Sequence, residues 1–422
     1  MNKIVLQNIT VEGSLVKYKF SVNQEMKRFF NAETMFLQYN QAIQDTPLSI
    51  LTIPFVNSMA GLSWLADAKL FVDEIDETYY YALKHIKLAY SELHGARLKG
   101  TFIPSIIRRN IINNNDHHLL LFGGGVDCFS SYLRNRDKVS GVVNIYGWAK
   151  DELDVSDVDV SDKKHTAAFA KQFGIISFHV TSNFASQFNL REIDKELSYK
   201  IVGTTYWYGF LHSMAFLSIS VPIAWLNNFS NLMIASSFTK GREDVHCGSF
   251  ITTDSEFKFA SNGVTLHDGF ELNRQEKVAL IVNCQRESSI PYYVQACSFN
   301  DHNCCTCEKC FRTVIELIAE NADPRDYGFN IEGSMFQHWN SVIDKDVALW
   351  GVSKESYYYN QTKMRILENY DNVQDKEFVD WFLSFDFDKA KRDGLWRYYR
   401  KNFFSIVKRK LKGRLHRKGE CN

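Results

Sequence analysis

Proline and glycine are scarce in this chain, with six Pro and 22 Gly among 422 residues. This low content excludes collagen-like repeats and extensive disorder as the main character of the protein. The formal net charge is zero, and the shares of hydrophobic residues (45%) and charged residues (23%) are those of an ordinary globular protein. At roughly 100–200 residues per domain, the length predicts two or three domains.

The sequence also lacks an uninterrupted apolar run that would span a bilayer. The most apolar stretch, residues 210–226, contains His212, three serines and Pro222, whereas a spanning helix needs about 20 predominantly apolar residues. The first residues, MNKIVLQNITVEGS, lack a basic segment followed by an apolar one, so we expect no signal peptide. We therefore expect a cytoplasmic protein.

The charge is distributed unevenly along the chain. Residues 397–422 contain ten Lys or Arg and one acid, Glu420, so this tail carries +9 and the other 396 residues carry −9. The acidic body argues against nucleic acid as a general partner. Within residues 397–418, apolar residues at four-residue steps predict a helix that lies on an anionic inner-membrane surface, with an acidic protein or an RNA backbone as alternatives. These apolar residues are Phe403, Val407, Leu411 and Leu415.

Three regions can be distinguished by their hydrophobic patterns. Residues 1–115 show strand alternation over 15–22 and a helical pattern over 74–93, which predicts a small α+β accessory domain. Over residues 116–330, short apolar runs alternate with helical segments, which predicts a parallel sheet with helices on both faces. Residues 331–422 predict a mostly helical region that ends in the basic tail.

A glycine-rich turn follows the first apolar run of the second region. The run at residues 119–122 predicts a buried parallel strand, and a helix is expected from about Cys128. Between them, three glycines at 123–125 let the backbone approach a ligand, and the helix start favours an anion. Asp127 is placed to cap the helix or to hold phosphate-bound Mg²⁺, and a tight turn without a ligand is the alternative. Neither a Gly-Lys-Ser/Thr motif nor the G-x-G-x-x-G spacing is present, which argues against a kinase-type P-loop and a dinucleotide fold.

The segment 123–128 resembles the Ser-Gly-Gly-x-Asp-Ser loop of the N-type ATP pyrophosphatases, the PP-loop family, with Gly123 and Cys128 where that family has serines. The resemblance implies an adenine nucleotide α-hydrolase-like α/β fold, with ATP and Mg²⁺ as ligands and transfer of AMP to a carbonyl oxygen. Because two hydroxyl donors to phosphate are missing, we expect ATP binding with slow turnover. The residues that the resemblance assigns to ATP are Phe122, Gly123, Gly124, Gly125, Val126, Asp127 and Cys128.

Five of the nine cysteines lie within residues 297–310. This spacing is typical of a metal site rather than of a secreted disulfide framework. Cys305 is left over, His302 is a weaker alternative ligand, and an iron–sulfur cluster is the alternative to zinc. Four thiolates fill a tetrahedral coordination sphere, so we expect a structural Zn²⁺ without an open position. The expected ligands are Cys297, Cys304, Cys307 and Cys310.

The position of this cysteine cluster adds a second resemblance. A Cys-x6-Cys-Cys-x-Cys-x2-Cys pattern that follows a glycine loop and precedes an Arg-bearing helix is similar to the 7-cyano-7-deazaguanine synthase-like branch of the PP-loop family, over residues 116–330. The resemblance implies an ATP-dependent C–N ligase. A carboxylate or amide carbonyl, on a small molecule or a protein terminus, is adenylated with release of pyrophosphate, and ammonia or an amine then displaces AMP.

Two cations stand at the start of a predicted helix. Asn273 and Glu276 form a capping-box pattern, which places Arg274 and Lys277 in the first turn, where the helix dipole disfavours positive charge. We therefore expect both cations to face phosphate and to act in catalysis together with Asp127. A solvated charged face is the alternative.

Other polar positions are weaker candidates. The loop 248–254 is expected to reach the active site or to be a plain polar loop. The resemblance to the synthase-like branch implies a place near the nucleotide for His212, and a position in the core is the alternative. Asp154, Asp157 and Asp159 are expected to solvate a loop, with Mg²⁺ binding as the alternative.

Two other functions stay open at this stage. The altered glycine loop suggests a non-catalytic nucleotide-binding scaffold. A sulfur-transferring enzyme of nucleic-acid modification would use some cysteines as persulfide carriers, although the acidic body and the closed metal spacing argue against it. Homodimerisation is also left open.

Overall fold

The structure is a computed structural model that describes residues 1–147, 157–242, 244–288, 290–297, 302–346 and 355–386, together with Lys389, Arg392, Trp396 and Arg400. The chain divides into two compact units, Met1–Lys277 and Val278–Asn422. Except for Arg400, the predicted surface-binding segment 397–418 lies outside the described residues.

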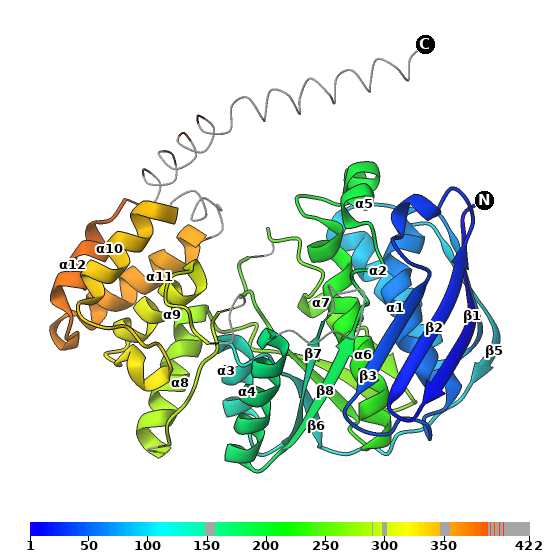
Figure 1. The fold of residues 1–422 in the computed structure, drawn as a ribbon, viewed down its shortest axis with the longest axis horizontal. Coiled ribbons are helices and arrows are strands. Elements are labelled where there is room, and N and C mark those ends of the chain that lie inside the picture. Colours follow the sequence, from blue (N-terminus) through cyan, green and yellow to red (C-terminus); the bar gives the residue numbers. More distant parts are fainter. Residues whose placement is uncertain are drawn as a thin grey trace. The chain divides into compact units, whose positions relative to one another are not determined.

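One 11-stranded sheet runs through the first unit, in the order β10-β11-β9-β6-β7-β8-β3-β2-β1-β4-β5 (Figure 1). Its strands are β1 (Lys3–Glu12), β2 (Leu15–Val22), β3 (Thr34–Tyr39), β4 (Lys69–Asp76), β5 (Thr101–Arg108), β6 (His118–Leu121), β7 (Val139–Tyr146), β8 (Ile176–Ser182), β9 (Asn231–Ala235), β10 (Lys258–Phe259) and β11 (Gly263–Asp268).

Five neighbouring strands, β11, β9, β6, β7 and β8, run parallel. The predicted parallel sheet with helical connections is therefore present. Numbered from β6 in chain order, leaving out β10, the strands lie in the order 3-2-1-4-5. The order reverses between β6 and β9, and open α/β sheets bind ligands beyond the carboxyl ends of strands at such a reversal.

The N-terminal strands continue this sheet rather than forming a sheet of their own. β3 pairs antiparallel with β8, with Leu37 opposite Ser182. The two compact units meet after residue 277, whereas the sequence patterns distinguish regions at 115/116 and 330/331. The pairing of β3 with β8 joins the first of these regions to the second, and local hydrophobic periodicity does not reveal it.

The helices of the first unit include two that are apolar on all sides. α1 and the stretch 207–226 are long and apolar enough to cross a membrane, but 94% and 78% of an 18-residue apolar window in each is buried within the protein, as expected of core helices. They pack on each other, with the Asn57 side chain donating to the carbonyl of Met214. The helices are α1 (Leu48–Leu65), α2 (Glu77–His94), α3 (Val126–Arg134), α4 (Asp157–Phe173), α5 (Leu190–Leu197), the π-helical η3 (Trp207–Leu211), α6 (His212–Leu226) and α7 (Ile251–Asp254), with 3₁₀ turns η1 (Lys27–Phe29) and η2 (Ser198–Lys200).

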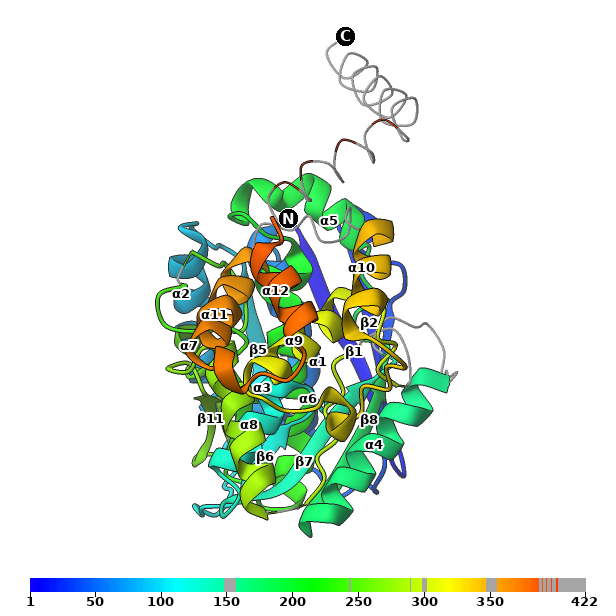
Figure 2. The ribbon, with the colours of Figure 1, turned by 90° about the vertical axis from the view of Figure 1, so that its left-hand side faces the viewer.

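The second unit is helical in its described part, as predicted. Helix α8 (Arg274–Ser288) begins at the end of the first unit. α9 (Glu308–Ala319), α10 (Met335–Asp346), α11 (Glu355–Glu368) and α12 (Lys376–Ser384) lie beside one another (Figure 2), with 3₁₀ turns η4 (Pro324–Tyr327) and η5 (Tyr370–Asn372). Phe311 of α9 stacks edge-on against Trp339 of α10, and both side chains are fully buried.

Candidate nucleotide site and metal centre

The glycine loop connects β6 to α3 at the point where the strand order reverses. Gly124 has φ of +78°, a conformation that favours glycine. Gly125 is the N-cap of α3 and makes no side-chain capping bond. No side chain caps the start of this nine-residue helix, where the helix dipole favours an anion.

The side chains of two residues that flank the glycines are buried. Phe122 and Val126 are each 3% exposed, and the Phe122 ring stacks on Phe169. Both side chains are therefore turned away from solvent, and the Phe122 amide donates to the carbonyl of Val143 at 2.9 Å. A Cβ built on Gly123 would meet no described atom within 4 Å, so the loop is open on that side.

Cys128 occupies the position at which the resembled loop has its second serine. Its Sγ donates to the carbonyl oxygen of Gly125 at 3.2 Å. Burial raises the pKa of the thiol to about 11, so it is neutral at pH 7. The thiol thus stabilises the turn and is a weak donor in place of a hydroxyl.

The three predicted catalytic residues lie together. Asp127 Oδ1 is 3.1 Å from Lys277 Nζ, and Asp127 Oδ2 is 3.5 Å from Arg274 Nη1. Lys277 Nζ also donates to the carbonyl of Ser236, directly after β9. The lysine therefore links the end of β9 to the start of α3, across the point where the strand order reverses. Its side chain is only 3% exposed.

Local structure explains how Arg274 and Lys277 reach this place. The predicted capping box is present, with Asn273 Oδ1 accepting from the Glu276 amide at 3.0 Å and Glu276 Oε2 accepting from the Asn273 amide at 2.7 Å. Both cations face the carboxylate of Asp127 beside the N-terminus of α3. A helix N-terminus with fixed cations beside it favours an anionic ligand.

The sequence analysis did not identify a neighbouring element at the end of β11. Asp268 Oδ1 accepts from Asn135 at 3.2 Å and lies beside Arg134, whose Nη1 is 3.7 Å from Oδ2. Gly269 has φ of +79°, and a Cβ there would lie 3.5 Å from Cε of Lys277. The Asp-Gly pair at 268–269, a dipeptide typical of turns, was the available signal.

The other polar positions singled out in the sequence lie in separate elements. Residues 251–254 form α7, and Asp254 is 1% exposed, so this stretch is not a plain surface loop. The prediction that Asp157 and Asp159 lie in a loop is wrong, because both belong to the first turn of α4. Asp154 lies outside the described residues, and Asp157 and Asp159 are described by their backbone alone. A helical N-terminus rich in Asp agrees with the helix dipole.

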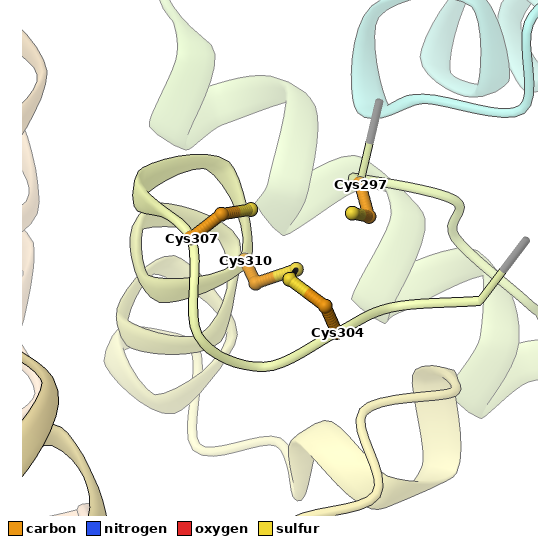
Figure 3. A group of neighbouring side chains, drawn as sticks. All are labelled: Cys297, Cys304, Cys307 and Cys310. Carbon is orange, nitrogen blue, oxygen red and sulfur yellow. Dashed lines mark hydrogen bonds between the residues drawn. The ribbon is translucent and has the colours of Figure 1, made fainter. Parts of the chain in front are cut away.

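The second unit contains the cysteine cluster. One ligand atom from each of the four predicted cysteines lies within 4.8 Å of the others, and Sγ of Cys304 is 3.9 Å from Sγ of Cys310. Tetrahedral zinc with Zn–S bonds of about 2.3 Å requires sulfur separations of about 3.8 Å. The cluster, with its sulfurs facing a common point in Figure 3, therefore fits zinc.

Thiol chemistry in the cluster favours metal binding. Cys310 donates a hydrogen bond to Cys307, which lowers the pKa of Cys307 to about 7 and raises that of Cys310. The thiolate is the form that binds metal. Cys297 and Cys310 are buried and the other two ligands are half-buried. With four protein sulfurs, zinc would be structural and would offer no open position to a substrate.

A residue outside the predicted ligand set holds the cluster together. Asn303 accepts from the backbone amides of Ala296 and Cys297 at 2.9 and 3.2 Å, and its amide donates to the carbonyls of Val294 and Gly328. Cys305, the spare cysteine, has φ of +52° and provides the left-handed turn between two ligands. His302 is exposed and is not part of the converging group.

Comparison of the chain with protein-family models, with curated proteins and with solved structures finds no match. The site geometry is consequently the basis for any functional assignment.

Proposed function

We propose that the first unit is a PP-loop ATP-binding domain that adenylates a carboxylate or amide carbonyl and releases pyrophosphate, after which ammonia or an amine displaces AMP. The observation that carries the proposal is the position of the glycine loop, at the strand reversal and beside Arg274 and Lys277. A nucleotide polyphosphate is the ligand class that matches glycine backbone, helix N-terminus and paired cations together.

Each group has a defined role in this reaction. The backbone amides at the start of α3 would hold the phosphates. Lys277 and Arg274 would neutralise the negative charge that develops on the leaving pyrophosphate. The Lys277 side chain is only 3% exposed, so water would screen this interaction little. Because these groups are held before ATP arrives, positioning and electrostatics supply the catalysis without a protein nucleophile in this step.

Asp127 is the residue that fits Mg²⁺. Its carboxylate is 26% exposed and lies next to the glycine loop. Mg²⁺ takes one or two carboxylates and completes its octahedron with water and phosphate oxygens. The ion would offset the negative charge of the phosphates, and Lys277 and Arg274 would orient the carboxylate.

The binding step is tested by thermal unfolding with and without ATP and Mg²⁺. We expect ATP to raise the melting temperature of the wild type, because a ligand that binds only the folded state stabilises it. Gly124→Val should abolish the shift, since a β-branched residue is disfavoured at φ of +78°. Gly123→Ala is the matched control, because its Cβ enters open space. Equal shifts in all three proteins would rule out the loop as the phosphate site.

The chemical step is tested by pyrophosphate release over a panel of carboxylates and amides, with ammonium chloride present. Release that depends on a carbonyl compound and on Lys277 supports adenylation. If ATP raises the melting temperature but no compound of the panel leads to pyrophosphate release, the result supports a nucleotide-binding scaffold instead. The thiol of Cys128, in place of a serine hydroxyl, favours this alternative.

A further inference from the structure

A thiol and an imidazole face each other elsewhere in the first unit. Sγ of Cys247 is 3.7 Å from Nε2 of His212. Nδ1 of His212 lies 2.9 Å from the carbonyl oxygen of Trp207, and a carbonyl only accepts, so Nδ1 carries the ring proton. Nε2 therefore presents its lone pair to the thiol. A nucleophile, a base and a group that orients the base are the parts of an activated cysteine.

The imidazole is held by an unusual backbone segment. η3 is π-helical, and the Trp207 carbonyl accepts from the backbone amide of His212, five residues on, as well as from its ring. Single π-helical turns inside α-helices are frequent at functional sites. Burial lowers the pKa of His212, so the ring is a neutral base at pH 7. The side chain keeps a partly exposed edge.

The thiol is held by the residue that follows it. The Gly248 amide donates to the Tyr208 carbonyl at 2.7 Å, and the Gly248 carbonyl accepts from Tyr90 and Thr253. A Cβ on Gly248 would lie 2.9 Å from the backbone of Gly209. This close crossing of two backbones fixes Cys247 against η3, and only glycine permits it.

A buried polar group lies next to this pair. Asp254 accepts from Ser213 at 2.5 Å, from Ser249 at 2.7 Å and from His267 Nδ1 at 2.9 Å. The His267 side chain is 1% exposed, and its Nε2 has no hydrogen-bond partner among the residues that the structure describes. A buried, oriented imidazole nitrogen without a partner is costly in a folded protein unless a ligand meets it.

Topology places this pair at the same sheet edge as the glycine loop. α6 leads into β9, so the start of α6 with His212 lies at the carboxyl edge of the parallel strands. Cys247 belongs to the connection that leaves the carboxyl end of β9, and the glycine loop leaves the carboxyl end of the adjacent strand β6. Ligands of open α/β sheets bind along this edge.

We propose that Cys247, with His212 as its base and orienting partner, is a nucleophile that takes the acyl group from the acyl adenylate, formed from a carboxylate and ATP, before the amine attacks. Sγ forms a bond to the carbonyl carbon, AMP leaves with the electrons of the broken C–O bond, and the thiol proton moves to His212 Nε2. The amine then displaces the thiolate, releases one proton to water, and His212 returns its proton to sulfur. The inference rests on the proposed adenylation.

The pair is tested with p-nitrophenyl acetate at pH 7, a simple acyl donor, by mass spectrometry of acetylated peptides. His212→Asn is the main variant, because its amide can still donate to the Trp207 carbonyl while Nε2 is lost. We expect acetylation of Cys247 in the wild type and at least a tenfold slower reaction in His212→Asn, from the loss of a general base. Cys284, on α8, is the reference thiol and should react equally in both proteins.

Cys247→Ala is the second variant, with minimal change in volume. It should lose the acetyl adduct at this position yet keep the ATP-dependent melting shift, which separates failure of the thiol proposal from failure of ATP binding. Equal acetylation of Cys247 in the wild type and His212→Asn, or none in the wild type, would overturn the proposal. His212-dependent acetylation without any ATP shift would retain the thiol site and remove the proposed adenylation.

Discussion

The nucleotide site and the cysteine cluster are assembled in opposite ways. In the nucleotide site, Asp127 and Lys277 are 150 residues apart and meet because β6 and β9 are neighbours in the sheet. In the cluster, all four sulfurs come from residues 297–310 and converge around one turn and the start of α9. A site of the first kind depends on the sheet, whereas a site of the second kind depends on a metal that pulls a short loop together.

This difference predicts how each site fails. Loss of a ligand in the cluster removes the free energy of metal binding, about 10–16 kcal/mol for structural zinc sites. Loss of a charged group in the nucleotide site leaves the sheet intact and removes only its contribution to the transition state, about 2.7–4 kcal/mol for one such donor. The experiments below compare the two.

The largest effect is expected for Cys307→Ser. The wild type should contain close to one zinc per chain by elemental analysis, and the variant should lose most of it and become less soluble, because a three-sulfur site binds zinc weakly. Cys305→Ser, which changes a buried cysteine outside the converging group, is the matched control and should keep the metal. An iron chromophore, or zinc unchanged in Cys307→Ser, would contradict the structural zinc site.

Lys277→Met should have the next largest effect. We expect pyrophosphate release to fall about 10²–10³-fold, while far-ultraviolet circular dichroism and zinc content stay unchanged. Lys195→Met is the control, since that lysine is 64% exposed. If Lys277→Met lowered the free energy of unfolding and left the turnover rate unchanged, the nucleotide site would contribute to folding, as we expect of the cysteine cluster.

Restoring the two serines of the resembled loop tests whether the missing hydroxyl groups slow the reaction. Gly123→Ser points into open space, and Cys128→Ser keeps a donor near Gly125. Hydrogen bonds to charged groups contribute about 1.5–3 kcal/mol each, so the double variant should release pyrophosphate on the order of a hundredfold faster. A complete loss of activity would show instead that the loop is adapted to a different substrate and would remove the scaffold alternative.

Asn303→Ala should have the smallest effect. Removal of a residue that positions metal ligands typically lowers metal affinity about 10–100-fold. We expect zinc to be retained after purification but lost to a competing chelator at lower concentrations than in the wild type. Chelator titrations that coincide would show that the loop positions its thiolates without Asn303.

Hydrophobic periodicity explains which elements were predictable. α2 has an apolar stripe and appears where the pattern placed it, and the Asn273–Glu276 capping box is a local motif that formed as expected. α1 was missed because 17 of its 18 residues are buried, so no periodic stripe distinguishes it. The continuous sheet was missed because the pairing of β3 with β8 joins residues about 140 positions apart.

Features that depend on short stretches of chain follow from the amino-acid sequence alone, because backbone conformation and ligand reach act over a few residues. These features are the strand–glycine turn–helix unit around Gly124, the capping box at Asn273 and the four-cysteine spacing. The contact of Lys277 with Asp127 and that of Cys247 with His212 arise only when the chain folds. Such contacts depend on strand order and on the crossing of distant backbones, and neither is encoded in the pattern of any one segment.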